Sequence, residues 1–479
     1  MKKFRLFIEN FLVYGIGGII SKIIPLIMVP IITRIMPDST YFGISDMSNT
    51  IISFASALAI LGMYDAMYRI FFDKEEEEYK SIVCSTTLFF TLFTSIIVFA
   101  IMIILKEKVS QIFFGSIDYQ RIIYITAIAT LVTATNNIIS APTRMQNKRK
   151  VFLIVNTISP ILSYAIAIPL LLNGHYLIAL PLASAISGII IELVFAYMNH
   201  KWFSIKKIDK KMLKQLLMIA IPLFPNFLIY WVYNSFDKVM ITNMLGIGES
   251  GIYAVGAKIG AISQLIYLAF AGGWQYFSFS TMKEENQVKS NSLIYEYLGI
   301  ISYIATIFMC SFSHLIFRVL FEEEYLRGYI VAPYLFMAPL LQMLFQVACN
   351  QFLIIKKTWP NLFILIIGAI VNVTLNYVLI PLIGIEGAAI STLIGYIISN
   401  IIVVIVLKRM KLMIVSKRML ISAIIVLLYI VLWRIFLKDI IIINIVVIIL
   451  IMTIYILFYK KEVTMLLNNI KRKEESNGK

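Results

Sequence analysis

The sequence predicts an all-α integral membrane protein with about fourteen transmembrane helices, arranged as two six-helix lobes and two extra C-terminal helices. Three observations lead to this fold class. Of the 479 residues, 60% are hydrophobic and only 14% are charged, which leaves too little polar surface to cover a soluble protein of this size. The apolar residues come in runs of roughly 20, the length of a helix that crosses a bilayer. The third observation is a weak internal repeat, described below.

Apolar runs of bilayer length occur fourteen times along the chain. We expect an N-terminal lobe at residues 1–213, a C-terminal lobe at 214–410, and two further spans with a basic tail at 411–479. The expected spans are 11–33, 43–68, 82–105, 122–142, 151–172, 176–198, 216–242, 251–275, 293–317, 329–355, 361–383, 386–407, 419–437 and 439–459.

Lysine and arginine are distributed unequally between alternate loops. With the N-terminus on the cytoplasmic side, 31 of the 42 fall on that side and 8 on the other. This bias follows the positive-inside rule and predicts that both termini are cytoplasmic. The net charge of +16 is spread over many short loops. We therefore interpret it as a topology signal and expect no nucleic-acid partner.

The loops leave no room for a soluble catalytic domain. None is longer than roughly 16 residues, and no Walker-type phosphate loop occurs in the sequence. The three histidines are scattered and the three cysteines lie in apolar segments without paired spacing. We expect no disulfide, no metal site and no cofactor.

Two pairs of segments recur at nearly the same offset. The segment TRIMPDSTYFGIS from Thr33 is similar to TNMLGIGESGIYAV from Thr242, about 209 residues later. In the second pair, Pro169 matches Pro381 at an offset of 212. Because such an offset spans an even number of helices, the halves should be parallel repeats related by an axis along the membrane normal. Two such lobes would enclose a central cavity that opens to either side in turn.

Cations within or beside the spans are candidates for the lining of that cavity. An unpaired Lys or Arg in mid-bilayer costs about 2.5–3.5 kcal/mol, so it persists only where it faces water, pairs with an acid or reaches the surface. Lys22 and Lys258 lie inside spans, whereas Arg34 and Arg69 lie at span ends. Deep basic residues outnumber acidic ones, so we expect the cavity to favour an anion such as a lipid phosphate or diphosphate. Structural ion pairs are the alternative.

Four further charged residues could couple transport to an ion or pair with neighbours. Asp65 and Arg69 are four residues apart, a spacing that allows an ion pair on one helix face. Asp237 and Lys238 are adjacent and could neutralise each other. Glu192 is alone in its span, where it is either a coupling carboxylate or a buried acid with a polar partner.

Prolines occur in pairs in the first span of each lobe. Pro25 and Pro30 lie in the first, and Pro222 and Pro225 in the second. Proline bends or unwinds a helix, which a membrane protein tolerates where the freed backbone groups face water or neighbouring helices. These two helices could act as hinges, and simple packing kinks are the alternative.

A family resemblance is carried by four stretches, which are PLIMVPIITRIMPDSTYFGISDM, LGMYDAMYRIFF, IPLFPNFLIYWVYNSFDKVMITNMLGIGESGIYAVGAKI and LNYVLIPLIGIEGAAISTLIGYI. In this order they resemble the Wzx-type polysaccharide flippases of the multidrug/oligosaccharidyl-lipid/polysaccharide exporter (MOP) superfamily. The resemblance covers essentially the whole chain. It implies a V-shaped, MATE-like transporter in a bacterial inner membrane.

The resemblance also implies a function. Such a protein moves undecaprenyl-diphosphate-linked oligosaccharide to the outer leaflet, for O-antigen, capsule or a similar surface polymer, and a proton or sodium gradient drives it. Its partners would be that lipid-linked oligosaccharide, the coupling ion, membrane lipid and, as a candidate, a polysaccharide polymerase. Mapped by position, the cationic cavity of the family falls on Lys22, Arg34, Arg69 and Lys258.

Other functions stay open on the sequence. A drug/cation antiporter of the same superfamily would have acidic residues deep in the first lobe and usually twelve spans, and Lys22 argues against it. A membrane-bound polysaccharide polymerase or ligase would carry catalytic residues in a large outer loop, which is absent from the sequence. A scaffold without transport activity would not explain why Lys22 and Lys258 lie inside apolar spans, where a cation is costly.

Overall fold

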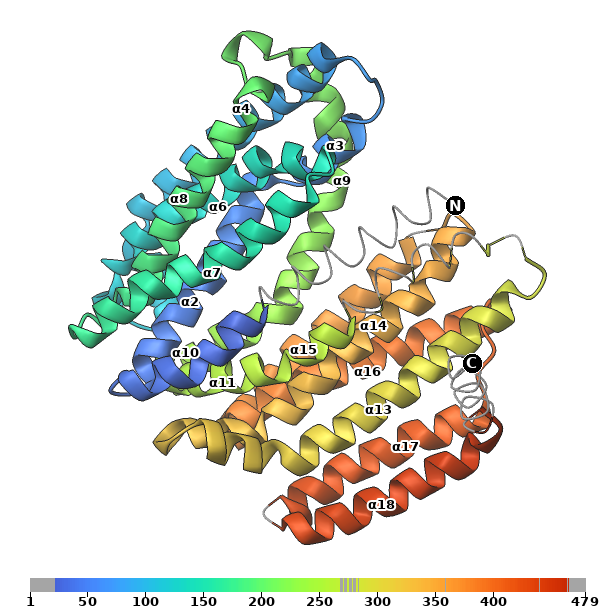
Figure 1. The fold of residues 1–479 in the computed structure, drawn as a ribbon. Helices are drawn as coiled ribbons and strands as arrows, with labels where there is room; N and C mark the ends of the chain where they lie inside the picture. The colour runs from blue at the N-terminus through green and yellow to red at the C-terminus, as the bar shows by residue number, and fades with distance from the viewer. Residues whose placement is uncertain are drawn as a thin grey trace, which may run out of the picture.

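A computed structural model describes residues 22–267, 270, 274, 278, 281, 282, 284–357, 359–438, 440–462 and 464. The helices form two lobes that meet at one end and diverge toward the other, which gives a V shape (Figure 1). We call the end at which the lobes meet the closed end, and the opposite end the open end.

The first lobe contains seven helices, namely α2 (Ser39–Ile60), α3 (Met63–Ile70), α4 (Glu77–Ile104), α5 (Lys106–Phe114), α6 (Ile122–Met145), α7 (Arg149–Leu172) and α8 (Ala179–Asn199). The second lobe contains α10 (Asp237–Leu245), α11 (Ile247–Gly260), α13 (Gln287–Leu320), α14 (Ala332–Ile354), α15 (Trp359–Ile383) and α16 (Ile385–Arg409). The chain ends with α17 (Lys417–Leu432) and α18 (Ile441–Phe458). Residues 22–35 are also helical.

Among the described residues, eleven helices are long and apolar enough to cross a bilayer, or twelve if α2 and α3 form one bent span. They match twelve of the fourteen predicted spans. The remaining two, 11–33 and 251–275, lie partly outside the described residues, so the count of fourteen stays a prediction. The fold class is confirmed, and the chain is a multi-pass membrane protein.

Polar side chains define where several of these helices begin. The Asp38 carboxylate accepts a hydrogen bond from the Thr40 amide (2.8 Å) at the start of α2. Asp209 accepts one from the Met212 amide (2.6 Å) at the start of α9 (Lys210–Trp231). Such caps satisfy backbone donors that have no partner in the first turn. Each side chain therefore fixes where its helix enters the membrane.

The predicted span 43–68 is broken between α2 and α3, which are bent by 48°. Leu61 and Gly62 have φ angles of 49° and 76° at the break. A Cβ atom on Gly62 would lie 2.6 Å from the carbonyl oxygen of Ala220 on α9. Glycine is required here because it permits both the left-handed backbone and this close approach.

At the closed end, α2 and α11 cross with their backbones in contact (Figure 1). A Cβ atom on Gly43 would lie 2.2 Å from the Ile247 carbonyl oxygen, and one on Gly251 would lie 2.1 Å from the Ser39 carbonyl oxygen. No side chain fits in either gap. The two glycines, which fall in the matched segments of the repeat, therefore allow the lobes to close on each other.

Helix α9 passes from one lobe to the other. Its first half packs with the first lobe, where Leu216 and Ala220 are fully buried beside Met63 and Trp202. Its end continues as a π-helical turn, Val232–Phe236, whose Tyr233 is buried in the second lobe. The expected lobe boundary at 213/214 falls in the first turn of this crossing helix, and the boundary itself stays a prediction.

The C-terminal helices α17 and α18 pack on the second lobe through two ion pairs. Arg418 Nε lies 2.6 Å from Glu296 Oε1 of α13, near the open end. Arg434 contacts both carboxylate oxygens of Glu386, with its NH2 2.7 Å from Oε2, near the closed end. The helix pair is thus attached to the second lobe at both ends.

Candidate functional site in a cavity between the lobes

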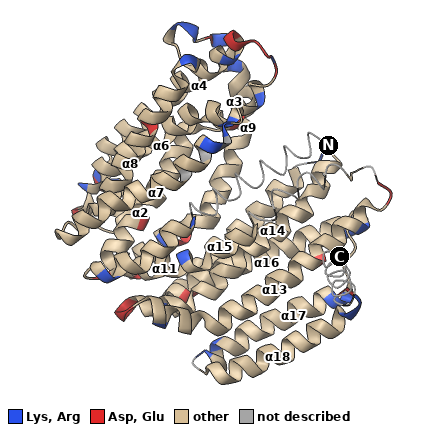
Figure 2. Cartoon of the chain, in the orientation of Figure 1, with Lys and Arg blue, Asp and Glu red and all other residues tan. Residues whose placement is uncertain are grey.

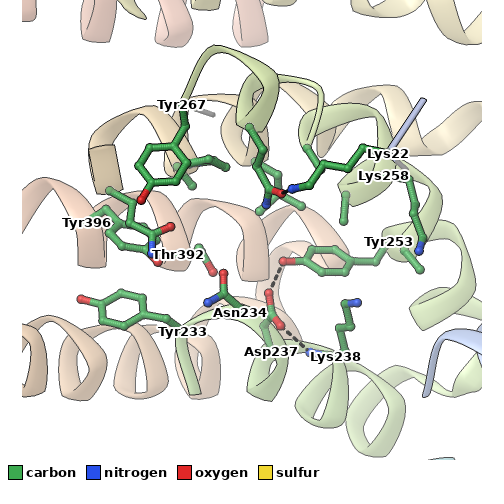
Figure 3. Close-up of a pocket in the computed structure, with 18 residues that line it drawn as sticks. Lys22, Tyr233, Asn234, Asp237, Lys238, Tyr253, Lys258, Tyr267, Thr392 and Tyr396 are labelled. Carbon is green, nitrogen blue, oxygen red and sulfur yellow. Dashed lines mark hydrogen bonds between the residues drawn. The ribbon is translucent and has the colours of Figure 1, made fainter. Parts of the chain in front are cut away.

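A cavity of about 510 Å³ lies in the second lobe, where its helices face Lys22 of helix 22–35. Its walls come from helix 22–35, the π-helical turn after α9, and helices α10, α11, α14 and α16. One side is cationic and carries Lys22, Lys238 and Lys258, whereas the other carries tyrosines 233, 267 and 396 (Figure 3). We call it the central cavity. Its volume is within the range of ordinary ligand sites.

The π-helical turn places two polar side chains in the central cavity. Tyr233 bonds to the Ser399 hydroxyl (3.0 Å), while Asn234 is exposed to the cavity. A π turn inserts one extra residue into a helix and is common at functional sites. Here the extra residue lets the chain carry both side chains into the cavity before α10 begins.

An ion pair joins the two lobes beside the central cavity. Asp46 of α2 is 5% exposed, and its Oδ2 lies 2.7 Å from Lys238 Nζ of α10. Its Oδ1 lies 3.9 Å from Lys258 Nζ of α11. A buried carboxylate is tolerated when it is paired in this way. One first-lobe acid is therefore held by two second-lobe lysines.

The adjacent residues Asp237 and Lys238 do not form the side-chain pair that we expected. Asp237 accepts a hydrogen bond from the Tyr253 hydroxyl and another from the Lys238 backbone amide, at 2.8 Å (Figure 3). The Lys238 ammonium instead reaches Asp46. Consecutive residues of a helix point in different directions, so their side chains do not face each other.

The charges around the central cavity sum to a net positive value. Three lysines (22, 238 and 258) face two aspartates (46 and 237), which leaves one positive charge. The Lys22 ammonium donates to the side-chain oxygen of Gln264. Within the described ranges Lys22 has no carboxylate partner. The arrangement therefore leaves Lys22, together with the 40% exposed Lys258, able to contact an anion.

The other two predicted cavity cations lie elsewhere. Arg34 is near the closed end, where its Nε lies 3.2 Å from Glu322 Oε1. Arg69 is exposed at the open end and pairs with Asp73, at 2.5 Å, instead of with Asp65. The reason is that α3 ends at Ile70 and the following turn brings Asp73 back to it. The structure brings Lys22 and Lys258 together, but not Arg34 or Arg69.

The remaining predicted carboxylates are also outside the central cavity. Asp65 is on the exposed side of α3, and no ion pair to it occurs in the described part of the chain. Glu192 lies on α8 inside the first lobe, within reach of the Thr135 hydroxyl. Neither residue approaches the lysines of the central cavity.

The predicted hinge prolines occupy two separate places. Pro25 lies in helix 22–35 beside Lys22, and Pro30 lies one turn and a half further on. Pro222 and Pro225 lie between the half of α9 that packs on the first lobe and its end in the second lobe. Helix α9 continues through both of its prolines, but they remove two backbone donors at the crossing point.

Asp46 is the site residue that the sequence reading missed. It lies in the predicted span 43–68, which also contains Asp65, so it is not a lone acid in its span as Glu192 is. Small polar neighbours made the segment look generally polar. Tyr253 was missed for a different reason, since a tyrosine in a membrane span gives no signal of its own.

An all-helical, two-lobed membrane fold of this kind is the fold of MOP-superfamily transporters. The lipid II flippase MurJ in an inward closed conformation matches with a TM-score of 0.71 and 15% identity, over 94% of this chain and 100% of that one. An inward-facing multidrug resistance transporter of the MATE family matches with a TM-score of 0.64 and 14% identity, over 83% of this chain and 94% of that one. An outward-facing MATE transporter matches with a TM-score of 0.58 and 15% identity, over 85% of this chain and 95% of that one. Identities this low define the fold alone.

The family follows from the sequence comparison. Residues 7–274, more than half of the 479, match the model of the family described as polysaccharide biosynthesis protein, and the chain belongs to this family. A curated relative is an uncharacterized membrane protein of Methanocaldococcus jannaschii, 25% identical over 244 residues. The match covers 48% of this chain and 47% of the relative, so it spans about half the length of each.

Proposed function

We propose that the protein is a flippase that moves a lipid-linked oligosaccharide with an anionic diphosphate headgroup across a bacterial inner membrane. The observation that carries this proposal is the central cavity, where Lys22 and Lys258 belong to a group of three lysines and two aspartates with one net positive charge. The family and the fold support a transporter rather than an enzyme.

The distribution of charge supports an orientation. Many Lys and Arg residues lie at the ends of the helices at the open end of both lobes (Figure 2). By the positive-inside rule, the open end then faces the cytoplasm, the side on which the sequence predicts both chain termini. In this orientation the lobes diverge toward the leaflet in which a lipid-linked oligosaccharide is assembled. The state described is one that accepts substrate from the cytoplasm.

The central cavity suggests how binding drives the change of state. Phosphate oxygens that approach Lys258 and Lys238 compete with Asp46 for the same two ammonium groups. Each ammonium that turns toward phosphate weakens the only ion pair seen here between α2 and the second-lobe helices α10 and α11, among the residues that the structure describes. The lobes can then separate at the closed end. A ligand shifts such an equilibrium by its differential affinity for the two states.

A driving ion would act on the same equilibrium. A proton on Asp46, or a sodium ion beside it, would also reduce its attraction for the lysines. Proton or sodium coupling is therefore part of the proposal, with Asp46 added to the earlier candidates Asp65, Glu192 and Asp237.

Transport by purified protein in proteoliposomes tests the function. The substrate is a fluorescent oligosaccharide linked to a polyprenyl diphosphate, and protected label is measured after quenching from outside. Lys22→Ala and Lys258→Ala should each weaken substrate binding about tenfold or more, seen as slower transport at low substrate concentration. The reason is that a hydrogen bond to a charged group contributes about 1.5–3 kcal/mol. Lys22→Arg should retain transport.

The matched control is Arg69→Ala, which removes one positive charge from an exposed pair with Asp73 outside the central cavity. Transport that is equal in wild type, Lys22→Ala and Arg69→Ala would refute the role of the central cavity. Transport of organic cations, with none of the lipid-linked substrate, would instead favour a drug antiporter.

A further inference from the structure

A second cavity, of about 430 Å³, lies inside the first lobe. It is enclosed by helix 22–35 and helices α2, α6, α7 and α8, and Lys258 of α11 closes it toward the second lobe. Much of its lining is neutral and polar, and these residues are Ser45, Asn49, Thr133, Ser159, Ser163, Tyr164, Ser184 and Ser187. We call it the hydroxyl cavity.

Many of these polar groups are free to bond with something inside the cavity. Serines and threonines in membrane helices usually donate to the carbonyl four residues before them, as Ser48 does to Ile44 (2.9 Å). In the described portion of the chain, the side chains of Ser159, Ser163 and Ser184 have no such partner, and neither do Asn49 and Tyr164.

Free hydroxyls at membrane depth need a polar partner. A buried donor or acceptor without a hydrogen bond is unfavourable, and hydrocarbon provides none. The hydroxyl cavity must therefore hold water or a polar ligand. Apart from the Asp46–Lys258 pair at its edge, its lining is uncharged. This chemistry suits a neutral molecule rich in hydroxyl groups.

The hydroxyl cavity and the central cavity are neighbours. Lys258 lines both, and a smaller cavity of about 260 Å³ lies against Lys22, Pro25, Lys258 and Gln264. A phosphate held by Lys22 and Lys258 would thus stand at the mouth of the hydroxyl cavity. In a lipid-linked oligosaccharide, the group bonded directly to that phosphate is a sugar.

We infer that the hydroxyl cavity is the subsite for neutral sugar residues next to the diphosphate. This inference rests on the proposed function. The serines of α7 and α8 and Asn49 of α2 exchange hydrogen bonds with sugar hydroxyls, while apolar neighbours such as Phe42 and Leu180 contact the C–H faces of the ring. The first lobe recognises the sugar, and the lysines at the junction hold the phosphate.

The test compares two ligands on the full-length protein in lipid nanodiscs. One is a bare polyprenyl diphosphate, and the other carries a single neutral hexose on the terminal phosphate. Wild type should bind the sugar-bearing ligand more tightly. Ser159→Ala with Ser163→Ala should weaken the sugar-bearing ligand by about tenfold and leave the bare diphosphate unchanged. Ser48→Ala, whose hydroxyl is already bonded to the helix backbone, is the matched control.

The outcomes separate this inference from the proposed function. Equal affinity of wild type for the two ligands, or equal weakening of both by the serine substitutions, overturns the sugar subsite while leaving the flippase intact. No binding of either ligand, or binding insensitive to Lys22→Ala, overturns the proposed function. Binding of the bare diphosphate reports folding of each variant. If the double variant fails to fold, Ser184→Ala on α8 should give the same selective loss, and its absence would also overturn the subsite.

Discussion

Replacing Asp46 by asparagine should shift the protein away from the state described here. The substitution keeps the size of the side chain and removes its charge. Lys238, which is 17% exposed, then loses the carboxylate 2.7 Å from its ammonium. Because α2 carries Asp46 and α10 carries Lys238, the lost attraction acts between the lobes. In the opposite state, in which the lobes have separated at the closed end, this ion pair is absent, so the substitution does not destabilise that state.

The size of the effect follows from the burial of the pair. Removing one partner of a buried ion pair costs about 3–5 kcal/mol, because the other charge stays buried. Asparagine can still accept a hydrogen bond from Lys238, and Lys258 is 40% exposed at 3.9 Å and contributes little. We therefore expect about 3 kcal/mol, which changes the ratio of the two states by roughly a hundredfold.

Spin labels on the two lobes can measure this shift. Exposed positions at the closed end are Glu107 of α5 and Arg318 of α13, and the three native cysteines are buried. In wild type the distance between the labels should have one narrow distribution. In Asp46→Asn a second, longer population should dominate. Adding Lys238→Met should restore much of the short population, since it removes the uncompensated charge.

An unchanged distance distribution in Asp46→Asn would refute the reasoning. So would additive effects of Asp46→Asn and Lys238→Met, because a contacting pair must show coupling in a double-mutant cycle. Either result would mean that the ion pair does not hold the lobes together.

Three other perturbations give distinct outcomes. Gly251→Val should prevent closure of α2 on α11 and leave a cysteine placed at the closed end accessible to thiol reagents. If that cysteine stays inaccessible, the backbones of α2 and α11 need not touch for the closed end to seal. Arg434→Met removes the ion-pair partner of Glu386, which is 9% exposed, and leaves it, within the described part of the chain, only the hydrogen bond from the Tyr334 hydroxyl. This should lower stability by about 2–4 kcal/mol, seen as a lower melting temperature in detergent. An unchanged melting temperature would mean that the Arg434–Glu386 pair does not help to hold α17 and α18 on the second lobe. Pro222→Ala with Pro225→Ala should slow transport without changing substrate affinity, and unchanged transport would remove the hinge role of α9.

The fold class was predictable because hydropathy alone reports membrane spans. The position of Lys22 and Lys258 in a cavity lining was also predictable, since a cation inside an apolar run is costly unless it faces water or a partner. The ion pairs of Asp46 with Lys238 and Lys258 were not predictable. Asp46 and Lys238 are 192 residues apart in the sequence, and only the packing of α2 against the second lobe brings them together. The pairing of Arg69 with Asp73 depended on a turn that the helical pattern does not reveal.

The close contact of Gly43 and Gly251 has a consequence for the speed of the transport cycle. Each glycine directs a Cα–H bond at a carbonyl oxygen of the other helix, Ile247 in one case and Ser39 in the other. Such weak hydrogen bonds contribute about 0.5–1 kcal/mol each. Beside them the Phe42 ring packs edge-on against Tyr325 of the second lobe. The backbone part of this contact can therefore separate without rotamer changes, so the ring contact and the Asp46 ion pair set how fast the closed end opens.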